Sequence, residues 1–378
     1  VGRKPAFMAT SLWAGTCGMM CATASGIGWL VFWRLLMGFA LGGNLAVDFS
    51  LFMEFVPAAV RGRMTVLLTV FASLGSLTTA ALAWGLLDVV GWRVYAVMCS
   101  FPGILVGVMR TFMHESPHWL AVTGQSDKAK EVLLHVAQVN GVTLPLKDDA
   151  RVISKNDRQE STLKTLGRLM QGNLRARIIL MSLSWFSLSF GFYGYSVWGP
   201  TYFAVRGFDS AGVYQAIFVS VLFQIPGTAL AAFLVEKVGR RKLLVGFSLC
   251  CAVAVSGIAM FVNKTAMVFF SLLLNFNTAG LWAVTYTHTP EIFPTALRTT
   301  SMGVCSCVAR VAGIIVSLMG GTLLSTSVEA SVSTYAVAYI LVAALSHVIR
   351  IDMTGKDLSE AAEQGHEQSD GISLLHMS

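Results

Sequence analysis

Val238-Gly239-Arg240-Arg241 is a basic motif that has a second copy in the same chain, Val1-Gly2-Arg3-Lys4. An acid-proline-arginine motif is also duplicated, with Glu54, Pro57 and Arg61 in one copy and Glu291, Pro294 and Arg298 in the other. The members of every pair are 237 residues apart. Because separate motifs share one offset, the chain consists of two copies of one unit. Repeated halves that contain long apolar segments are typical of secondary transporters.

The composition places these apolar segments in a membrane. Hydrophobic residues make up 55% of the 378 residues and charged residues only 12%, whereas an ordinary soluble domain is about half apolar and roughly a quarter charged. We predict an all-α, polytopic bundle of membrane helices, which is an integral multi-pass protein in contact with the lipid bilayer. A spanning helix needs about 20 apolar residues, and ten segments qualify: 6–23, 29–53, 64–87, 94–112, 178–199, 212–235, 243–262, 266–288, 301–324 and 332–349.

The basic residues indicate an orientation and not a nucleic-acid partner. The net charge is +7, but Lys and Arg lie between the apolar segments and do not form one solvated face. The loops on one side hold 20 Lys and Arg, whereas the opposite loops hold three, Arg93, Arg206 and Lys264. Since cytoplasmic loops carry the excess of Lys and Arg, both copies of the repeated motifs are predicted to be cytoplasmic.

The repeat also predicts how the chain is divided. Two spans precede the second basic motif and none precedes the first, so we expect a fragment of a twelve-span protein that lacks its first two spans. The expected parts are a truncated N-terminal half with four spans (1–112), a cytoplasmic central loop (113–176), a C-terminal half with six spans (177–349) and a disordered cytoplasmic tail (350–378). In the central loop, Ser126 is expected to cap a helix that ends at Asn140-Gly141.

One segment matches the pattern of zinc proteases. His114-Glu115-Ser116-Pro117-His118 contains two His and a Glu at the spacing that places both His ligands on one helix face, with the Glu as base. Pro117 lies between the two His residues, where it would break that helix, and no third ligand stands out. The seven cysteines all lie inside apolar segments and are interpreted as small buried hydrophobic residues. We therefore predict no metal, no cofactor and no enzymatic activity.

The same segment has a second interpretation. Glu115-Ser116-Pro117-His118-Trp119-Leu120 resembles the Pro-Glu-Ser-Pro-Arg-Trp-Leu motif of major facilitator transporters, and Glu236-Lys237-Val238-Gly239-Arg240-Arg241 resembles their Asp-x-x-Gly-Arg-Arg/Lys loop. The acid-proline-arginine motifs resemble those that close the fourth and tenth spans of this superfamily. The resemblance covers essentially the whole chain and implies two pseudo-symmetric halves that rock around a central cavity. It also implies a cytoplasmic gate made of Gly2, Arg3, Glu54 and Arg61 in the first copy and Glu236, Gly239, Arg240, Glu291 and Arg298 in the second.

The sequence of the expected seventh span indicates which subfamily the chain resembles. Sugar porters carry Gln-Gln-x-Ser-Gly there, whereas this chain has the aromatic-rich stretch Trp185–Gly194. The stretch Gly38–Glu54 resembles synaptic vesicle glycoprotein 2-related proteins and organic ion transporters. The resemblance implies secondary transport of a small organic solute, an organic ion, by alternating access, with protons as the candidate coupling ion. The alternative is a transporter-like membrane protein that binds or regulates without transporting, and an embedded hydrolase is the least favoured.

Three charged residues lie inside predicted spans: Arg34, Asp48 and Arg310. Charge within a membrane is costly and marks either a functional site or a structural ion pair, and both interpretations stay open for each residue. Asp48 is the candidate for proton coupling, because a carboxyl group in apolar surroundings can bind and release a proton. Four aromatic residues either line a cavity that stacks on a flat solute or holds an organic cation, or pack against lipid and neighbouring helices; they are Trp185, Tyr193, Trp282 and Tyr286.

Overall fold

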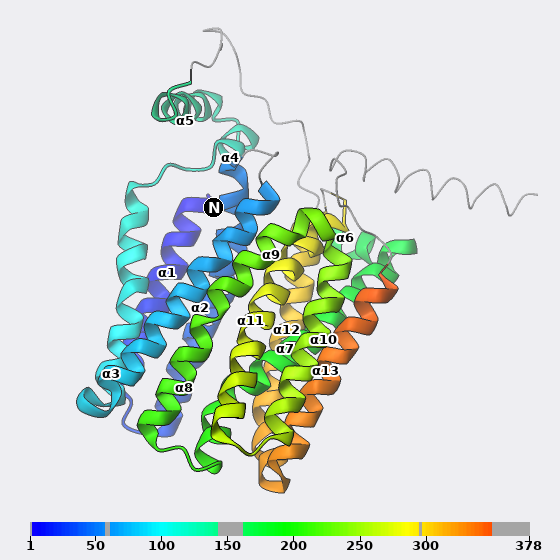
Figure 1. The fold of residues 1–378 in the computed structure, drawn as a ribbon. Coiled ribbons are helices and arrows are strands. Elements are labelled where there is room, and N and C mark those ends of the chain that lie inside the picture. Colours follow the sequence, from blue (N-terminus) through cyan, green and yellow to red (C-terminus); the bar gives the residue numbers. More distant parts are fainter. Residues whose placement is uncertain (1, 57–60, 143–161, 295–296, 350–378) are drawn as a thin grey trace, which may run out of the picture. The chain divides into compact units, whose positions relative to one another are not determined.

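The computed structural model describes residues 2–56, 61–142, 162–294 and 297–349, and the regular structure within these ranges is helical (Figure 1). The predicted all-α helix bundle is thereby confirmed. The chain divides into two compact units, one formed by Val1–Arg61 with Gly85–Glu160 and the other by Gly62–Trp84 with Ser161–Ser378. We call them the N-terminal unit and the C-terminal unit. The predicted tail, 350–378, lies outside the described residues.

The N-terminal unit contains α1, α2, the part of α3 from Gly85 onwards and, among the described residues, four shorter helical elements. In chain order the elements are α1 (Arg3–Met20), η1 (Cys21–Thr23), α2 (Ile27–Phe55), α3 (Arg61–Met109), η3 (Arg110–Phe112), α4 (Pro117–Val122) and α5 (Ser126–Val139). With 49 residues, α3 is far longer than the roughly 20 residues that cross a bilayer. Gly91 interrupts it with φ 75° and ψ 162°, a backbone conformation that glycine adopts without steric cost. Gly91 therefore separates the two spans predicted at 64–87 and 94–112.

The helix predicted in the central loop is α5, with one difference at its start. Gln125 is the N-cap residue, and Ser126 is already helical, so the predicted cap is one residue late. The end agrees with the sequence, since Asn140 is the C-cap and Gly141 has φ 66°. Ala129 and Val132 of α5 are buried against Leu120 of α4. The apolar stripe of α5 is therefore used to hold α4 and α5 together.

The C-terminal unit contains a short helix followed by the helices of the second repeat. These are α6 (Thr162–Leu169), α7 (Gly172–Val205), α8 (Ser210–Leu222), α9 (Gln224–Val238), α10 (Arg240–Met260), α11 (Lys264–Glu291), α12 (Arg298–Thr326) and α13 (Val328–Val348). α7 packs against α12 and α13, and α10 packs against α11 and α13. At Gly194 a side chain would overlap the Tyr335 ring of α13. The absence of a side chain there lets α7 and α13 approach closely.

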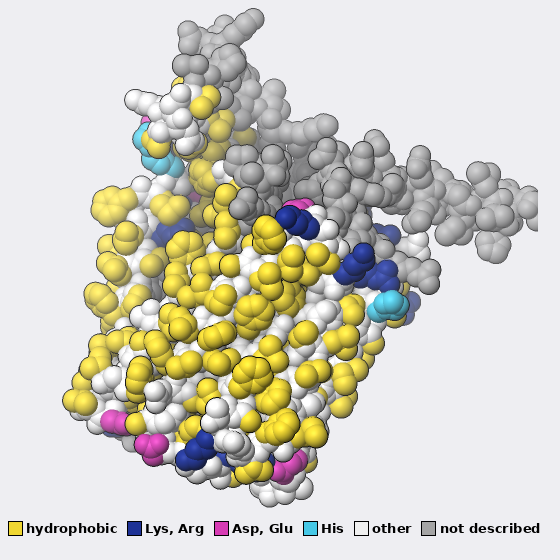
Figure 2. Space-filling view, viewed as in Figure 1, with side chains coloured by type: hydrophobic (Ala, Val, Ile, Leu, Met, Phe, Trp, Pro, Cys, Tyr) yellow, Lys and Arg dark blue, Asp and Glu magenta, His cyan; other side chains and the backbone are white. Residues whose placement is uncertain are grey.

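Seven helical stretches of the described chain are long and apolar enough to cross a membrane, and Leu67–Phe112, which contains Gly91, is one of them. On the face of the C-terminal unit seen in Figure 2, hydrophobic side chains cover the length of the helices, and charged side chains gather at their ends. The exposed apolar residues include Phe233, Val253 and Val337. An apolar surface of this extent is suited to contact with lipid, as expected of an integral multi-pass protein.

Candidate functional site

Gly239 determines the position of the first candidate site. It joins α9 to α10 with φ 94° and ψ 150°, a conformation that residues with side chains rarely adopt. Arg240 thus becomes the first residue of α10, and its side chain returns to the end of α9, where Nη1 donates to the Val235 carbonyl oxygen at 3.2 Å. The Arg240 side chain is only 6% exposed. A cation this well buried is stable only when it is paired and hydrogen-bonded.

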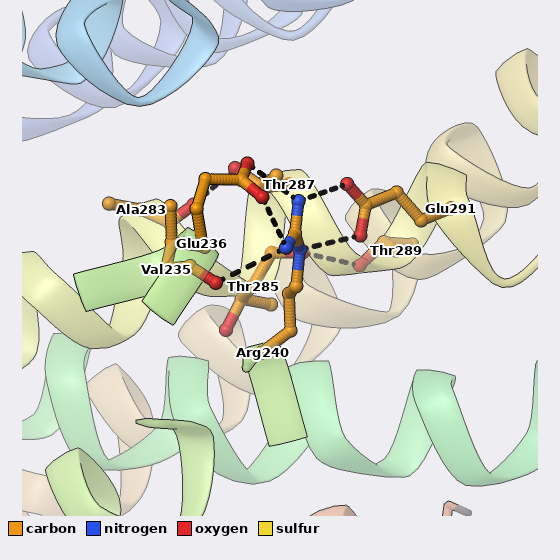
Figure 3. A network of polar contacts seen from close by, with 8 residues as sticks. All are labelled: Val235, Glu236, Arg240, Ala283, Thr285, Thr287, Thr289 and Glu291. Carbon is orange, nitrogen blue, oxygen red and sulfur yellow. Dashed lines mark hydrogen bonds and ion pairs between the residues drawn. The ribbon is translucent and has the colours of Figure 1, made fainter. Parts of the chain in front are cut away.

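Arg240 lies between two carboxylates, as Figure 3 shows. Its Nε and Nη2 donate to the two oxygens of Glu291 at 3.0 and 3.1 Å, and its Nη1 and Nη2 donate to those of Glu236 at 2.9 Å each. With the bond to Val235, these contacts match the five N–H donors of a guanidinium group. The cluster joins the ends of α9, α10 and α11, and Glu291 is much less exposed (14%) than Glu236 (51%).

Arg298, the remaining member predicted for this cluster, begins α12. Its Nε donates to the Phe293 carbonyl oxygen at 3.3 Å, which ties the start of α12 to the segment after α11. The structure therefore brings Arg240, Glu236 and Glu291 into direct contact. The hydrogen bond from Arg298 Nε goes instead to a backbone carbonyl, that of Phe293. Buried threonines of α11 near the cluster use their hydroxyl protons within the helix, with Thr287 donating to Ala283 and Thr289 to Thr285 (Figure 3).

The first copy of the motif shows a different contact. The side chains of Arg3, Glu54 and Arg61 lie outside the described residues, but Gly2 packs directly against the Glu115 carboxylate. That carboxylate accepts hydrogen bonds from the backbone N–H of Lys4 at 3.1 and 3.3 Å and from Ser116 at 3.0 Å. A carboxylate at the first turn of a helix accepts hydrogen bonds from N–H groups that would otherwise be unpaired. Its negative charge is also attracted to the positive end of the helix dipole. Sequence reasoning placed Glu115 in a motif but did not predict that it caps α1.

His114 and Pro117 have ordinary structural places. Pro117 is the first residue of α4, and Ser116 caps that helix by accepting from the Trp119 N–H at 3.1 Å. His114 precedes the helix, and its ring lies 4.7 Å from that of His135 on α5. The two His of the zinc-protease pattern therefore do not belong to one helix.

The second candidate site is an aromatic cluster formed by α7 and α11. The Trp185 ring meets those of Trp282 and Tyr286 edge-on, with centroids 5.6 and 5.2 Å away, and Trp282 stacks on Tyr286 at 5.5 Å. Phe192, which was not singled out from the sequence, lies edge-on to Trp282 at 5.7 Å. Such edge and offset arrangements are favourable for aromatic rings. Four aromatic side chains thus form one continuous cluster.

The aromatic side chains of this cluster differ in burial and in whether their N–H groups are already hydrogen-bonded. Trp185 is 1% exposed, and its Nε1 donates to Thr289 Oγ1 at 2.9 Å, so its ring and its N–H are enclosed by neighbouring side chains. Trp282 and Tyr286 are half-buried. The Trp282 Nε1 has no acceptor among the described residues, although a buried N–H without a partner typically costs about 1–3 kcal/mol. The Trp282 Nε1 is thus a buried donor inside the aromatic cluster.

Arg310 brings a positive charge to the same site. It lies near the middle of α12, its side chain is exposed, and its Nη1 donates to the Tyr193 Oη at 2.7 Å. Tyr193 in turn contacts Phe192 edge-on at 5.2 Å. Arg310 is therefore connected through Tyr193 and Phe192 to the aromatic cluster.

The two other charges predicted inside spans belong to α2 of the N-terminal unit. Arg34 is exposed, and the Asp48 side chain lies outside the described residues. Their spacing of 14 residues on one helix places them on a similar face, as predicted, and about 21 Å apart along the axis.

Comparison with known proteins extends these findings. The profile of the family described as "Sugar (and other) transporter" matches residues 1–364. The niacin transporter NiaP of Acinetobacter baylyi is 33% identical over 317 residues, which cover 83% of this chain and 70% of that protein. The synaptic vesicle 2-related protein of Xenopus laevis is 25% identical over 386 residues, covering 96% and 69%. The structure of the proton:xylose symporter XylE bound to 6-bromo-6-deoxy-D-glucose superposes with a TM-score of 0.72 at 19% identity, covering 96% and 83%, and indicates a common fold.

Proposed function

The chain belongs to the sugar (and other) transporter family of the major facilitator superfamily, and from this premise we propose that it carries a small organic anion with a flat aromatic ring by alternating access. It is a multi-pass membrane transporter and not an enzyme. Sugars, organic ions and vitamins are all solutes to consider within so broad a family. The choice among them rests on the side chains of the C-terminal unit.

One observation carries the proposal: the exposed Arg310 guanidinium is held by Tyr193 near the middle of an otherwise apolar helix. A cation at this depth is costly unless it has a partner, and one hydrogen bond to a neutral phenol leaves most of its donors available. A carboxylate accepts two parallel hydrogen bonds from a guanidinium group. The positive charge also disfavours an organic cation, the other solute for which an aromatic cluster is suited.

The neighbouring aromatic side chains supply the second part of the recognition. Trp282 and Tyr286 are half-buried and stacked on one another, so a flat ring can extend the stack, a contact worth about 0.5–1.5 kcal/mol beyond buried area. The Trp282 N–H can donate to a ring nitrogen or to a carboxylate oxygen. Niacin, the solute named for the Acinetobacter relative, is a flat aromatic acid with these groups.

Asp48 remains our candidate for proton coupling. It lies on an apolar helix, where a carboxyl group that is neutral for part of a cycle costs less than a permanent charge. A permanent ion pair with an arginine is the competing possibility. In proteoliposomes, Asp48→Asn should retain solute exchange but lose uptake driven by a pH gradient. Full gradient-driven uptake by Asp48→Asn would refute the coupling role.

The solute proposal is tested with two compounds that share a ring. The full-length protein is reconstituted in proteoliposomes, and exchange of radiolabelled niacin is challenged with unlabelled niacin or with nicotinamide, its neutral amide. We expect niacin to compete at least tenfold better. Arg310→Gln should weaken niacin binding by about 10- to 150-fold, which corresponds to a lost charge-assisted hydrogen bond of about 1.5–3 kcal/mol.

The matched control is Lys264→Gln, which removes a cation that contacts only the Gly207 carbonyl and the Phe208 ring in the contacts described. This variant should exchange niacin as the unmodified protein does. Equal competition by nicotinamide, or niacin exchange unaffected by Arg310→Gln, contradicts the proposal. Saturable niacin binding without any flux would instead favour the transporter-like binding protein.

A further inference from the structure

A group of basic residues surrounds one end of the C-terminal unit. We call it the basic collar and define it as Lys164, Arg175, Arg241 and Lys242. Arg241 Nη2 donates to the carbonyl oxygen of His347, which joins the start of α10 to the end of α13. Figure 2 shows Lys, Arg and His side chains gathered at this end of α10 and α13. The collar is therefore a feature of the folded unit and not only of the sequence.

A buried apolar cluster fixes the position of α6 and α7 relative to the end of α13. Leu169 of α6, Ile178 of α7 and Ile349, the residue after α13, pack in the same cluster. Lys164, Arg175 and Lys242 are exposed and lie on elements that end or begin at this point. The described structure thus ends at Ile349, which packs against the same helices, α6 and α7, that carry Lys164 and Arg175.

The local charge is strongly unbalanced. Glu236 and Glu291 are the acidic residues in the described segments at this end. These segments are 162–178, 236–242, 289–294, 297–298 and 347–349. Both carboxylates bind Arg240, which is not part of the collar. The collar therefore presents a positive field to whatever lies next to it.

The charge of residues 350–378 complements that field. This segment contains six acidic residues, Asp352, Asp357, Glu360, Glu363, Glu367 and Asp370, and only two basic ones, Arg350 and Lys356. The other long segment outside the described residues, 143–161, has four acidic and four basic residues and offers no such excess. We propose that the acidic segment Asp352–Asp370 docks on the basic collar of its own chain.

The attachment point makes this contact efficient. A residue adds at most about 3.3–3.6 Å of reach, so Asp357, eight residues after Ile349, can lie up to about 28 Å from Ile349. A short flexible connection gives an effective concentration in the millimolar range, which lets several weak exposed ion pairs act together. The docked segment covers the collar and keeps anionic lipid headgroups away from it. Because these pairs are exposed, salt should weaken them.

The contact can be measured as a distance in the full-length protein. Spin labels are attached at Asn173→Cys on exposed α7 and at Ser359→Cys, in a background without reactive thiols and in nanodiscs of zwitterionic lipid only. At low salt we expect one short, narrow distribution of distances between the labels. At about 1 M salt, where the screening length is about 3 Å, the distribution should broaden and lengthen.

Charge substitutions test the assignment of the partners. Glu360→Gln, Glu363→Gln and Glu367→Gln together should release the tail at low salt, while the helices and solute exchange remain intact. Gln364→Asn, Gln368→Asn and Ser369→Thr change neighbouring residues without changing charge and serve as the control. Lys164→Glu, Arg175→Glu and Lys242→Glu should also release the tail, and changing the same three glutamates to lysine should restore the short distance.

The possible outcomes distinguish docking of the acidic tail on the collar from binding of anionic lipid headgroups there. A broad distribution at low salt that none of these substitutions changes contradicts the docking. So does a broad distribution combined with tight, collar-dependent retention of anionic lipid, since the collar would then bind headgroups and not the tail. Because the readout is a distance, it is independent of which solute the protein carries.

Discussion

Removing the charge of Glu291 tests the most buried ion pair of the described structure. Glu291 accepts two of the five hydrogen bonds made by Arg240, at 3.0 and 3.1 Å, and joins α11 to α10. Glu291→Gln keeps the shape of the side chain and one acceptor oxygen, but it removes the charge and one of the two bonds. Arg240 then depends on Glu236, at the end of α9.

The free energy lost in Glu291→Gln depends on how deeply the ion pair is buried and on which contacts of Arg240 remain. Two charges about 4 Å apart attract by about 4 kcal/mol at an effective dielectric constant of about 20. Glu236 still neutralises Arg240, and the amide retains a hydrogen bond, so we expect a loss of about 1.5–3 kcal/mol, the usual worth of one charge-assisted hydrogen bond. A loss of about 2 kcal/mol changes an equilibrium constant roughly 30-fold. We propose that this change favours the inward-facing state.

The assay combines stability with transport. Glu291→Gln should lower the free energy of unfolding of the purified protein by the amount given above, and it should slow solute exchange in proteoliposomes without abolishing solute binding. Glu236→Gln is the matched control. The Glu236 side chain is 51% exposed and lies before the break at Gly239, four residues from Arg240. Ion pairs of exposed side chains are worth about 0–1 kcal/mol.

Two outcomes would refute the reasoning. One is a wild-type exchange rate and an unchanged free energy of unfolding in Glu291→Gln. The other is a larger effect of Glu236→Gln than of Glu291→Gln, since burial would then not govern the strength of the pairs.

Two further expectations concern orientation and the capping of α1. Single cysteines at Lys147→Cys and Ser359→Cys, in a thiol-free background, should be shielded from impermeant reagents in intact cells, because the 20-to-3 distribution of basic residues predicts that both are cytoplasmic; labelling from outside would overturn that orientation. Glu115→Gln should lower the free energy of unfolding by about 0.5–2 kcal/mol, the usual range for a lost helix cap, whereas exposed Glu131→Gln should change it by less than about 0.5 kcal/mol. Equal stabilities of the two variants would contradict the capping role.

The repeat and the apolar segments predict the fold because both depend on pattern alone. The helical class, the membrane location and the superfamily are confirmed, and so is the resemblance to synaptic vesicle 2-related proteins. The roles of the site residues stay predictions. The resemblance to major facilitator transporters also implied that Arg240 and Glu291 belong to one cytoplasmic gate, and in the structure their side chains are in contact.

The remaining features of the site depend on three-dimensional contacts that spacing does not encode. The reversal at Gly239 brings Arg240 back to Glu236, four residues earlier, and no helical periodicity predicts that across a break. Trp185 was one of several equivalent aromatics in the sequence, and only packing shows that it is buried against Thr289. Glu115 lies 111 residues from Lys4, so its capping contact has no local signal.

The close contact of α7 with α13 limits how the candidate solute site can adapt. Tyr193 and Gly194 are consecutive residues of α7, and they face different neighbours, Tyr193 towards Gly313 of α12 and Gly194 towards the Tyr335 ring. A shift of α7 towards α13 would press Gly194 against the Tyr335 ring, which already lies in close contact with it. The size limit of the proposed solute site would then depend partly on the close packing of α7 against α13. On the proposed solute site, Gly194 would therefore help to set the size limit without contacting the solute.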